Sequence, residues 1–310
     1  MTHLPITPEL RPLGKSGLSV FPIAYGMWRF AGTDPEAARA KLEAALDAGM
    51  TLFDTADIYG IDGGGSIGAA EELFGAALKL DPSLRARMVI ATKGGISIGV
   101  PYDSGTDHLT ATCEGSLKRM GIEHIDLYQI HRPDLLAHPQ EVAATLTRLK
   151  EQGKIGHVGV SNHTAAQFEA LQACLDFPIV THQPEFSCLT LGPLFDGVLD
   201  QSMRRGVALL AWSPLAGGRL ALAPAEAETK PDGARLAALI RELDKVAAEA
   251  GVAREAVALA WLLAHPAGVI PIIGTQNAGR IAAATDAFKV KLDKRTWYAI
   301  LQASMGERLP

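Results

Sequence analysis

The feature that most constrains the fold is an alternation of short apolar runs and helical patterns, which begins near residue 20. Seven runs are predicted to be strands after the first: residues 49–53, 88–92, 125–130, 154–160, 179–183, 207–212 and 269–273. Helices are predicted between several of them, at residues 35–48, 107–120, 139–152 and 164–175. Apolar strands that alternate with helices are typical of a parallel sheet covered on both faces. Eight such units predict an α/β protein with a single (β/α)₈ TIM barrel.

Two segments fall outside this repeat. Residues 12–21 precede the first barrel strand and are predicted to form an N-terminal hairpin that caps the bottom of the barrel. Residues 217–235, rich in Ala, Pro, Gly and Glu, form a long connection before a helix predicted at 236–250. Because this connection follows a strand and long loops are often functional, we expect it on the active face. The repeat also leaves an extra helix at the C-terminus. No linker divides the chain, so residues 1–310 are predicted to form one domain.

Composition narrows the possible partners and the compartment. The net charge of −5 gives no basic surface for nucleic acid, so we expect no nucleic-acid partner. The three cysteines, Cys113, Cys174 and Cys188, lack C-x-x-C spacing and are interpreted as reduced packing residues. No apolar run approaches the length of a membrane span, and the first residues do not resemble a signal peptide. We therefore expect a cytoplasmic protein with no membrane partner.

Four polar side chains lie at or beyond the ends of predicted strands: Asp54, Tyr59, Lys93 and His131. Asp54, Lys93 and His131 follow one another at intervals of roughly 40 residues, enough for a helix and a return strand each time. In a (β/α)₈ barrel the carboxyl ends of the strands meet on one face, where the active site is built. A carboxylate, a phenol, an ammonium and an imidazole that converge there indicate proton transfer to a polar substrate.

The expected chemistry centres on Lys93 and Tyr59. An ammonium beside a phenol favours the phenolate, so Lys93 is expected to lower the pKa of Tyr59 from its ordinary value of ~10. Such a phenol is a usable proton donor near neutral pH. His131 could orient a carbonyl oxygen or assist the proton transfer. In the alternative interpretation Asp54 and Lys93 form a structural ion pair and Tyr59 is only a loop aromatic.

Several motifs of the chain resemble those of the aldo-keto reductases. The resemblance begins with Asp54-Thr55-Ala56-x-x-Tyr59-Gly60, Thr92-Lys93 and His131-Arg132-Pro133-Asp134. It continues through residues 116–121, 125–128, 159–162, 183–187, 211–215 and 271–274, and it covers roughly residues 12–305. The closing segments, including residues 211–220, are most similar to bacterial oxidoreductases of the YdhF type.

The resemblance implies NADPH-dependent reduction of aldehydes or ketones, with a small-molecule carbonyl compound as substrate. In this family the hydride comes from the nicotinamide and the proton from a tyrosine, here Tyr59. Lys93 and Asp54 would tune and hold that tyrosine, and His131 would orient the substrate. Met27 and Trp28, at the end of the first strand, are expected to wall the substrate pocket.

The resemblance also implies a set of cofactor-binding residues. They comprise Ser161, Asn162 and Gln183 for the carboxamide, Trp212 for stacking on the nicotinamide, Ser213, Leu215 and Gly217 for the pyrophosphate, and Gly274, Thr275, Gln276 and Arg280 for the adenosine phosphate end. Gly274 stands where some relatives carry lysine, so a preference for NADP over NAD depends mainly on Arg280. A helix predicted to start near Asn277 would present its positive end to phosphate.

Three other functions are compatible with parts of the pattern. In a Schiff-base lyase Lys93 would be the nucleophile, which requires an uncharged amine. A metal-dependent hydrolase could use Asp54, Asp57 and His131, but Lys93 would repel the ion, and we expect no metal. A nucleotide-binding regulatory subunit would keep the cofactor contacts and turn over slowly.

Overall fold

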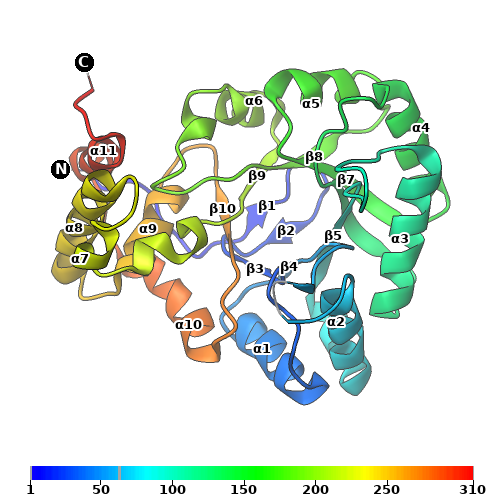
Figure 1. Ribbon diagram of the computed structural model, residues 1–310, viewed down its shortest axis with the longest axis horizontal. Coiled ribbons are helices and arrows are strands. Elements are labelled where there is room, and N and C mark those ends of the chain that lie inside the picture. Colours follow the sequence, from blue (N-terminus) through cyan, green and yellow to red (C-terminus); the bar gives the residue numbers. More distant parts are fainter. Residues whose placement is uncertain (1, 62–63, 310) are drawn as a thin grey trace.

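The computed structural model describes residues 2–61 and 64–309 and contains a closed barrel of parallel strands (Figure 1). Neighbouring strands follow the order β10-β3-β4-β5-β6-β7-β8-β9, so the last strand pairs with the first. The strands are β3 (Ala24–Gly26), β4 (Leu52–Asp54), β5 (Val89–Gly94), β6 (Ile125–Ile130), β7 (Ile155–Ser161), β8 (Ile179–Gln183), β9 (Ala208–Ala211) and β10 (Ile270–Ile273). The predicted (β/α)₈ barrel is confirmed.

Helices surround the barrel on all sides (Figure 1). They are α1 (Pro35–Asp47), α2 (Ala69–Leu80), α3 (Thr106–Met120), α4 (Pro139–Glu151), α5 (Ala165–Gln172), α6 (Val198–Arg205), α9 (Arg254–Leu263) and α10 (Ala278–Ala283), with short 3₁₀ turns η2 (Pro82–Arg87), η3 (Gly192–Leu194) and η5 (Ala284–Lys289). Local signals fix where helices begin. At α1, the Asp34 side chain accepts a hydrogen bond from the Ala37 N–H at 2.7 Å, and Pro35 fills the first helical position.

An N-terminal hairpin closes the amino-terminal end of the barrel, as predicted. Strands β1 (Arg11–Pro12) and β2 (Ser19–Val20) pair antiparallel, and Leu13 and Val20 pack with the apolar residues inside the barrel. Gly14 has a φ of 57°, and a Cβ there would lie 2.2 Å from the Val180 carbonyl oxygen. Only glycine fits this close approach, so the hairpin turn lies directly against β8.

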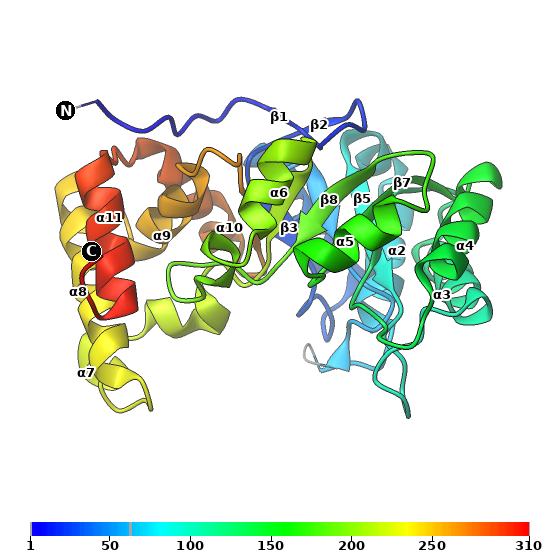
Figure 2. The same cartoon turned by 90° about the horizontal axis from the view of Figure 1, so that it is seen from above.

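The long connection after β9 contains more structure than the sequence indicated. It holds η4 (Ala216–Ala221) and α7 (Pro224–Ala227), and α8 (Gly233–Ala250) begins three residues before the predicted position of 236. Gly233 is buried, and a Cβ there would lie 2.3 Å from the Glu228 carbonyl oxygen, so the absent side chain lets α8 start against α7. Figure 2 shows α7 on the opposite side of the molecule from the hairpin.

The predicted C-terminal helix is α11 (Lys294–Met305), which packs beside α8 at one side of the barrel (Figure 1). It is joined to α9 by two tryptophans that stack with ring centroids 4.7 Å apart. The indole N–H of Trp261 donates to the Trp297 carbonyl at 3.1 Å, and that of Trp297 donates to the Trp261 carbonyl at 3.0 Å. This reciprocal pair fixes the end of the chain to the barrel.

Two further properties concern the described residues 2–61 and 64–309. The cysteines are free thiols, with Cys113 and Cys188 buried and Cys174 partly exposed. No helix in these ranges is both long enough and apolar enough to cross a lipid bilayer.

Candidate active site

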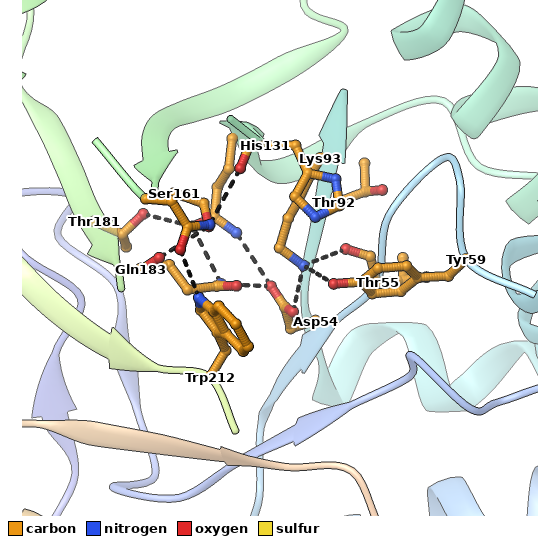
Figure 3. Close-up of polar contacts among 12 residues, drawn as sticks. Asp54, Thr55, Tyr59, Thr92, Lys93, His131, Ser161, Thr181, Gln183 and Trp212 are labelled. Atoms are coloured by element: carbon orange, nitrogen blue, oxygen red, sulfur yellow. Dashed lines mark hydrogen bonds and ion pairs between the residues drawn. The ribbon is translucent and has the colours of Figure 1, made fainter. Parts of the chain in front are cut away.

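The barrel brings Asp54, Tyr59, Lys93 and His131 together at the carboxyl ends of three neighbouring strands (Figure 3). Asp54 is the last residue of β4, and Lys93 lies within β5, so both strands run further than the sequence indicated. His131 directly follows β6. Tyr59 belongs to the loop before α2, and its carbonyl accepts a hydrogen bond from the Ala70 N–H at 3.1 Å.

Lys93 is fully buried, and all three N–H groups of its ammonium donate hydrogen bonds to other groups of the protein. Its Nζ lies 2.6 Å from Asp54 Oδ2, 2.8 Å from the Thr55 carbonyl oxygen and 3.1 Å from Tyr59 Oη. The ammonium therefore holds the carboxylate and the phenol in one fixed arrangement (Figure 3).

The second oxygen of Asp54 is held from the other side by two amides. Gln129 Nε2 donates to Asp54 Oδ1 at 3.1 Å and Gln183 Nε2 donates to the same atom at 2.9 Å. Thr181 fixes Gln129 in turn, donating to its Oε1 at 3.1 Å. Sequence reasoning missed Gln129, although an amide in the middle of an apolar strand is a signal that could have found it.

The surroundings set the charge of each group. Burial lowers the pKa of Lys93, but the negative charge of Asp54 and the contact with Tyr59 outweigh it and raise the pKa above its ordinary value. Burial also raises the pKa of Tyr59, and the opposing effect of Lys93 is smaller. Lys93 does lower this pKa, as expected, but the expectation of a net pKa below the ordinary value was wrong, because removing the phenol from water disfavours the phenolate more than the ammonium favours it.

His131 is neutral at physiological pH. Burial, followed by the positive charges of Lys93 and Arg132, lowers the pKa of His131 well below its ordinary value. Its ring lies edge-on to Tyr59 with centroids 5.6 Å apart. Among the described residues, its buried Nδ1 has no hydrogen-bond partner.

The four residues implied for the nicotinamide lie beside this cluster (Figure 3 labels Ser161, Gln183 and Trp212). Ser161 Oγ donates to the Gln183 carbonyl at 2.9 Å. Asn162, with a φ of 56°, donates through Nδ2 to Ser161 Oγ at 2.7 Å and accepts at Oδ1 from the Trp212 indole at 2.9 Å. The half-buried Trp212 ring thus has a defined position, with the Arg132 guanidinium 5.5 Å from its centroid.

The residues implied for the phosphates lie in two partly exposed segments. Ser213, Leu215 and Gly217 follow β9, where φ is 50° at Ser213 and 66° at Gly217. A Cβ added at Gly217 would meet no atom within 4 Å, so the backbone here faces open space. A backbone of this kind can approach a ligand closely.

The second of these segments follows β10 and leads into α10. Thr275 Oγ1 accepts from the Asn277 N–H at 3.3 Å, and Gln276 Nε2 donates to the Gly274 carbonyl at 3.4 Å. Asn277 caps α10 by accepting from the Arg280 N–H at 3.0 Å, which confirms the predicted helix start. The exposed Arg280 side chain has no ion pair with any residue in the described ranges.

The two residues expected to wall the substrate pocket differ in exposure. Met27 is completely buried, and its N–H donates to the Asp54 carbonyl at 2.9 Å. Trp28 is 42% exposed, with the Arg29 guanidinium 5.2 Å from the centroid of its ring. Of the two, Trp28 therefore presents a surface to a ligand.

A buried charged network behind the site was not anticipated. Glu71 is completely buried on α2, where it accepts from Thr92 Oγ1 at 2.5 Å and from Arg119 Nε at 2.8 Å. Burial, together with the charge of Glu71, raises the pKa of the neighbouring Asp57 to about 7. Because the Asp57 N–H donates to the Lys93 carbonyl at 3.1 Å, this network supports the strand that carries the lysine.

The geometry argues against two of the alternative functions, the Schiff-base lyase and the metal-dependent hydrolase. A Schiff-base lyase needs a neutral amine, whereas Lys93 is ion-paired and its pKa is raised. A metal-dependent hydrolase needs free carboxylate oxygens, whereas both oxygens of Asp54 already accept hydrogen bonds. Within residues 2–61 and 64–309, no group of three or more His, Cys, Asp or Glu is placed to hold a metal ion.

The structure thus places a buried Asp–Lys–Tyr cluster beside a histidine at the mouth of a (β/α)₈ barrel. The model of the aldo/keto reductase family matches residues 22–304, so the chain belongs to this family.

Similar proteins agree with this assignment. The chain is 49% identical to the 6-dehydroglucose reductase of Novosphingobium aromaticivorans, over the full length of both proteins. It is 38% identical to oxidoreductase YdhF of Escherichia coli, covering 92% of this chain and 94% of that protein, which agrees with the resemblance noted from the motifs. Among solved structures, it is similar to the thermostable aldo-keto reductase Tm1743 in complex with the inhibitor epalrestat, with a TM-score of 0.79, 26% identity, and coverage of 95% of this chain and 99% of that one. The family and these named reductases support carbonyl reduction as the general class of activity.

Proposed function

We propose that this protein reduces aldehydes or ketones to alcohols with NADPH and that Tyr59 supplies the proton. The observation that carries the proposal is the position of Lys93 Nζ, 2.6 Å from Asp54 Oδ2 and 3.1 Å from Tyr59 Oη. Because Tyr59 Oη accepts this hydrogen bond, its own O–H is left to donate to another group. No acceptor for it lies among the described residues, so a substrate oxygen can take that place.

The residues present fit the cofactor. When bound, NADPH supplies a hydride to the carbonyl carbon. Ser161, Asn162 and Trp212 would hold the nicotinamide, the open backbone at Gly217 would accept the pyrophosphate, and the exposed guanidinium of Arg280 would bind the 2′-phosphate. The side-chain amide of Gln183 already donates to Asp54, so its carbonyl side is the part available to a carboxamide.

Four side chains would take part in the proton transfer, with Tyr59 as the donor and Lys93, Asp54 and His131 in supporting roles. Tyr59 donates its phenolic proton to the carbonyl oxygen as the hydride reaches the carbon, and the resulting phenolate is stabilised by Lys93 at 3.1 Å. Asp54 keeps Lys93 charged and in place. His131, neutral and next to Tyr59, would donate a ring N–H to the same oxygen and so orient the carbonyl.

We propose a sugar aldehyde as the substrate class, on the strength of the 49% identity to the 6-dehydroglucose reductase across both full lengths. The experiment is a steady-state assay of NADPH oxidation with 6-dehydroglucose, D-glucose and a simple aliphatic aldehyde at matched concentrations. We expect 6-dehydroglucose to have the highest kcat/KM and the product to carry a new C6 hydroxyl. Turnover of the aliphatic aldehyde alone would contradict a sugar aldehyde as the substrate class but would still agree with NADPH-dependent carbonyl reduction. NADPH binding without turnover of any of these substrates would instead favour the regulatory subunit.

A further inference from the structure

The amino-terminal end of the barrel carries a cavity of about 1140 Å³ that is separate from the active site. Its walls come from the N-terminal segment, the hairpin, α6, the loop after α9 and α11. Ala208 opens β9 and Gly268 precedes β10, so the cavity faces the amino ends of the strands. Lys93 and Asp54 lie toward the carboxyl ends. In Figure 2 the N-terminal segment and the hairpin mark this side of the molecule.

The charge of this cavity is opposite to that of the whole protein. Arg11, Lys15 and Lys294 line it, and its lining contains no Asp or Glu, although the net charge of the chain is −5. Arg11 is fixed by donating to the carbonyl oxygens of Val269 at 2.6 Å and Leu263 at 3.1 Å. Lys15 and Lys294 are exposed and have no hydrogen bond or ion pair to any described residue. Two ammonium groups without a partner among the described residues therefore line the same concave surface.

Two further hydrogen-bond donors of the lining are also unused. Ser202 is 1% exposed, lines the cavity, and has no partner for its Oγ within the described residues. His265 accepts at Nδ1 from the Ala267 N–H at 3.2 Å, so its ring proton is on Nε2 and free to donate. Outside the lining, Asp200 lies near His265, and Asp293 caps α11 by accepting from Thr296.

The remaining wall of the cavity is apolar. It is built from residues that include Leu4, Pro5, Met203, Val207, Leu263 and Trp297. Met203 is 45% exposed, a large value for a methionine. Apolar walls with a few convergent polar groups, and a volume at or above the usual ~300–1,000 Å³, are the properties of a small-molecule site.

We propose that this cavity binds an organic anion with an apolar body, of the long-chain carboxylate class. Lys15 and Lys294 supply the charge that attracts the carboxylate, and Ser202 and His265 supply hydrogen-bond donors. The apolar wall formed by Leu4, Val207 and Trp297 covers the chain of the ligand. No such site follows from the carbonyl reductase reaction, which takes place at the other end of the barrel.

Titration calorimetry with three probes tests whether the site recognises both charge and apolar body. The probes are dodecanoate, dodecan-1-ol and acetate, each below any critical micelle concentration. We expect dodecanoate to bind with a stoichiometry of one, dodecan-1-ol at least tenfold more weakly, and acetate not measurably. Equal binding of the alcohol and the carboxylate, or no binding of dodecanoate, would overturn the proposal.

A matched set of variants tests where dodecanoate binds. The double variant Lys15→Gln/Lys294→Gln should bind it roughly tenfold more weakly, as expected for two ion pairs near the surface. The control is Lys118→Gln, which removes an exposed lysine of α3 that has no ion pair among the described residues. Helix α3 lies on the far side of the barrel (Figure 1), and this variant should bind like the wild type. An unchanged affinity in the double variant would overturn the proposal, because the carboxylate would then bind elsewhere, for example in the active site.

Discussion

At the scale of single residues, Lys93 fixes the positions of the polar groups around it. Its three N–H donors are shared among a carboxylate, a backbone carbonyl and a phenol, so each of these groups has one defined position. Burial makes this arrangement rigid and also sets the protonation states, with Tyr59 a neutral phenol and His131 a neutral imidazole. The site is therefore arranged before any ligand arrives.

Replacing Tyr59 with phenylalanine removes the proton donor and keeps the aromatic ring. General acid catalysis contributes about 10²–10⁴-fold, so turnover should fall by at least that order. Steady-state NADPH oxidation measures the loss, and the affinity for NADPH, followed by fluorescence titration, should stay near the wild-type value. Near-wild-type reduction by Tyr59→Phe would contradict the proposed mechanism.

The raised pKa of Tyr59 predicts how reduction depends on pH. A proton donor works only while protonated, and burial holds the pKa of Tyr59 above its ordinary value of ~10. The kcat for reduction should therefore stay level through neutral pH and fall only above about pH 10. A kcat profile measured from pH 6 to the alkaline limit of stability checks this, and a fall centred near neutral pH would show that another group limits the reaction.

At the scale of elements, sequence patterns predicted the barrel strands and several of the helices, because these signals are local. Apolar runs gave the strands, and Asp34 with Pro35 gave the start of α1. The start of α8 was missed because it depends on the contact of Gly233 with α7, which is a tertiary effect. Glu71 was missed for the same reason, because its partners Thr92 and Arg119 lie on other elements. The sign of the Tyr59 pKa shift required knowing how deeply the loop is buried.

The short helix α10 should carry the preference for NADPH over NADH. Arg280 is exposed in its first turn, and a charge-assisted hydrogen bond to a phosphate changes affinity by about ten- to a hundredfold. Arg280→Met should weaken NADPH binding by that order and leave NADH binding nearly unchanged. Arg295→Met, an exposed arginine on α11, is the control and should alter neither. Equal losses for both cofactors would mean that Arg280 shapes the segment and does not select the phosphate.

At the scale of the whole molecule, buried histidines should make the fold sensitive to acid. Burial lowers the pKa of His163 and of His182 to about 4 in each case, against ~6.5 when unfolded. Both folded-state values are lowered, so the stability they contribute is present above pH 6.5 and is lost as the pH falls toward 4. The midpoint of urea unfolding should be clearly lower at pH 5 than at pH 7.

A variant comparison tests the origin of this acid sensitivity. His182→Gln should reduce the difference between the two midpoints, because one group that must take up a proton on unfolding has been removed. His138→Asn changes an exposed histidine that caps α4 and should leave the difference as it was. An unchanged pH dependence in His182→Gln would assign the sensitivity to other groups.

The buried pair of Lys93 and Asp54 makes the candidate catalytic centre costly for the folded state. Removing one partner of such a pair leaves an uncompensated charge and typically destabilises a protein by about 3–5 kcal/mol, whereas neutral replacements of both are often tolerated. Lys93→Met should therefore unfold at lower urea than Asp54→Asn/Lys93→Met, although both would be inactive. The folded barrel would then be as stable, or more stable, without the buried pair on which its proposed activity depends. This would be a trade-off between stability and activity.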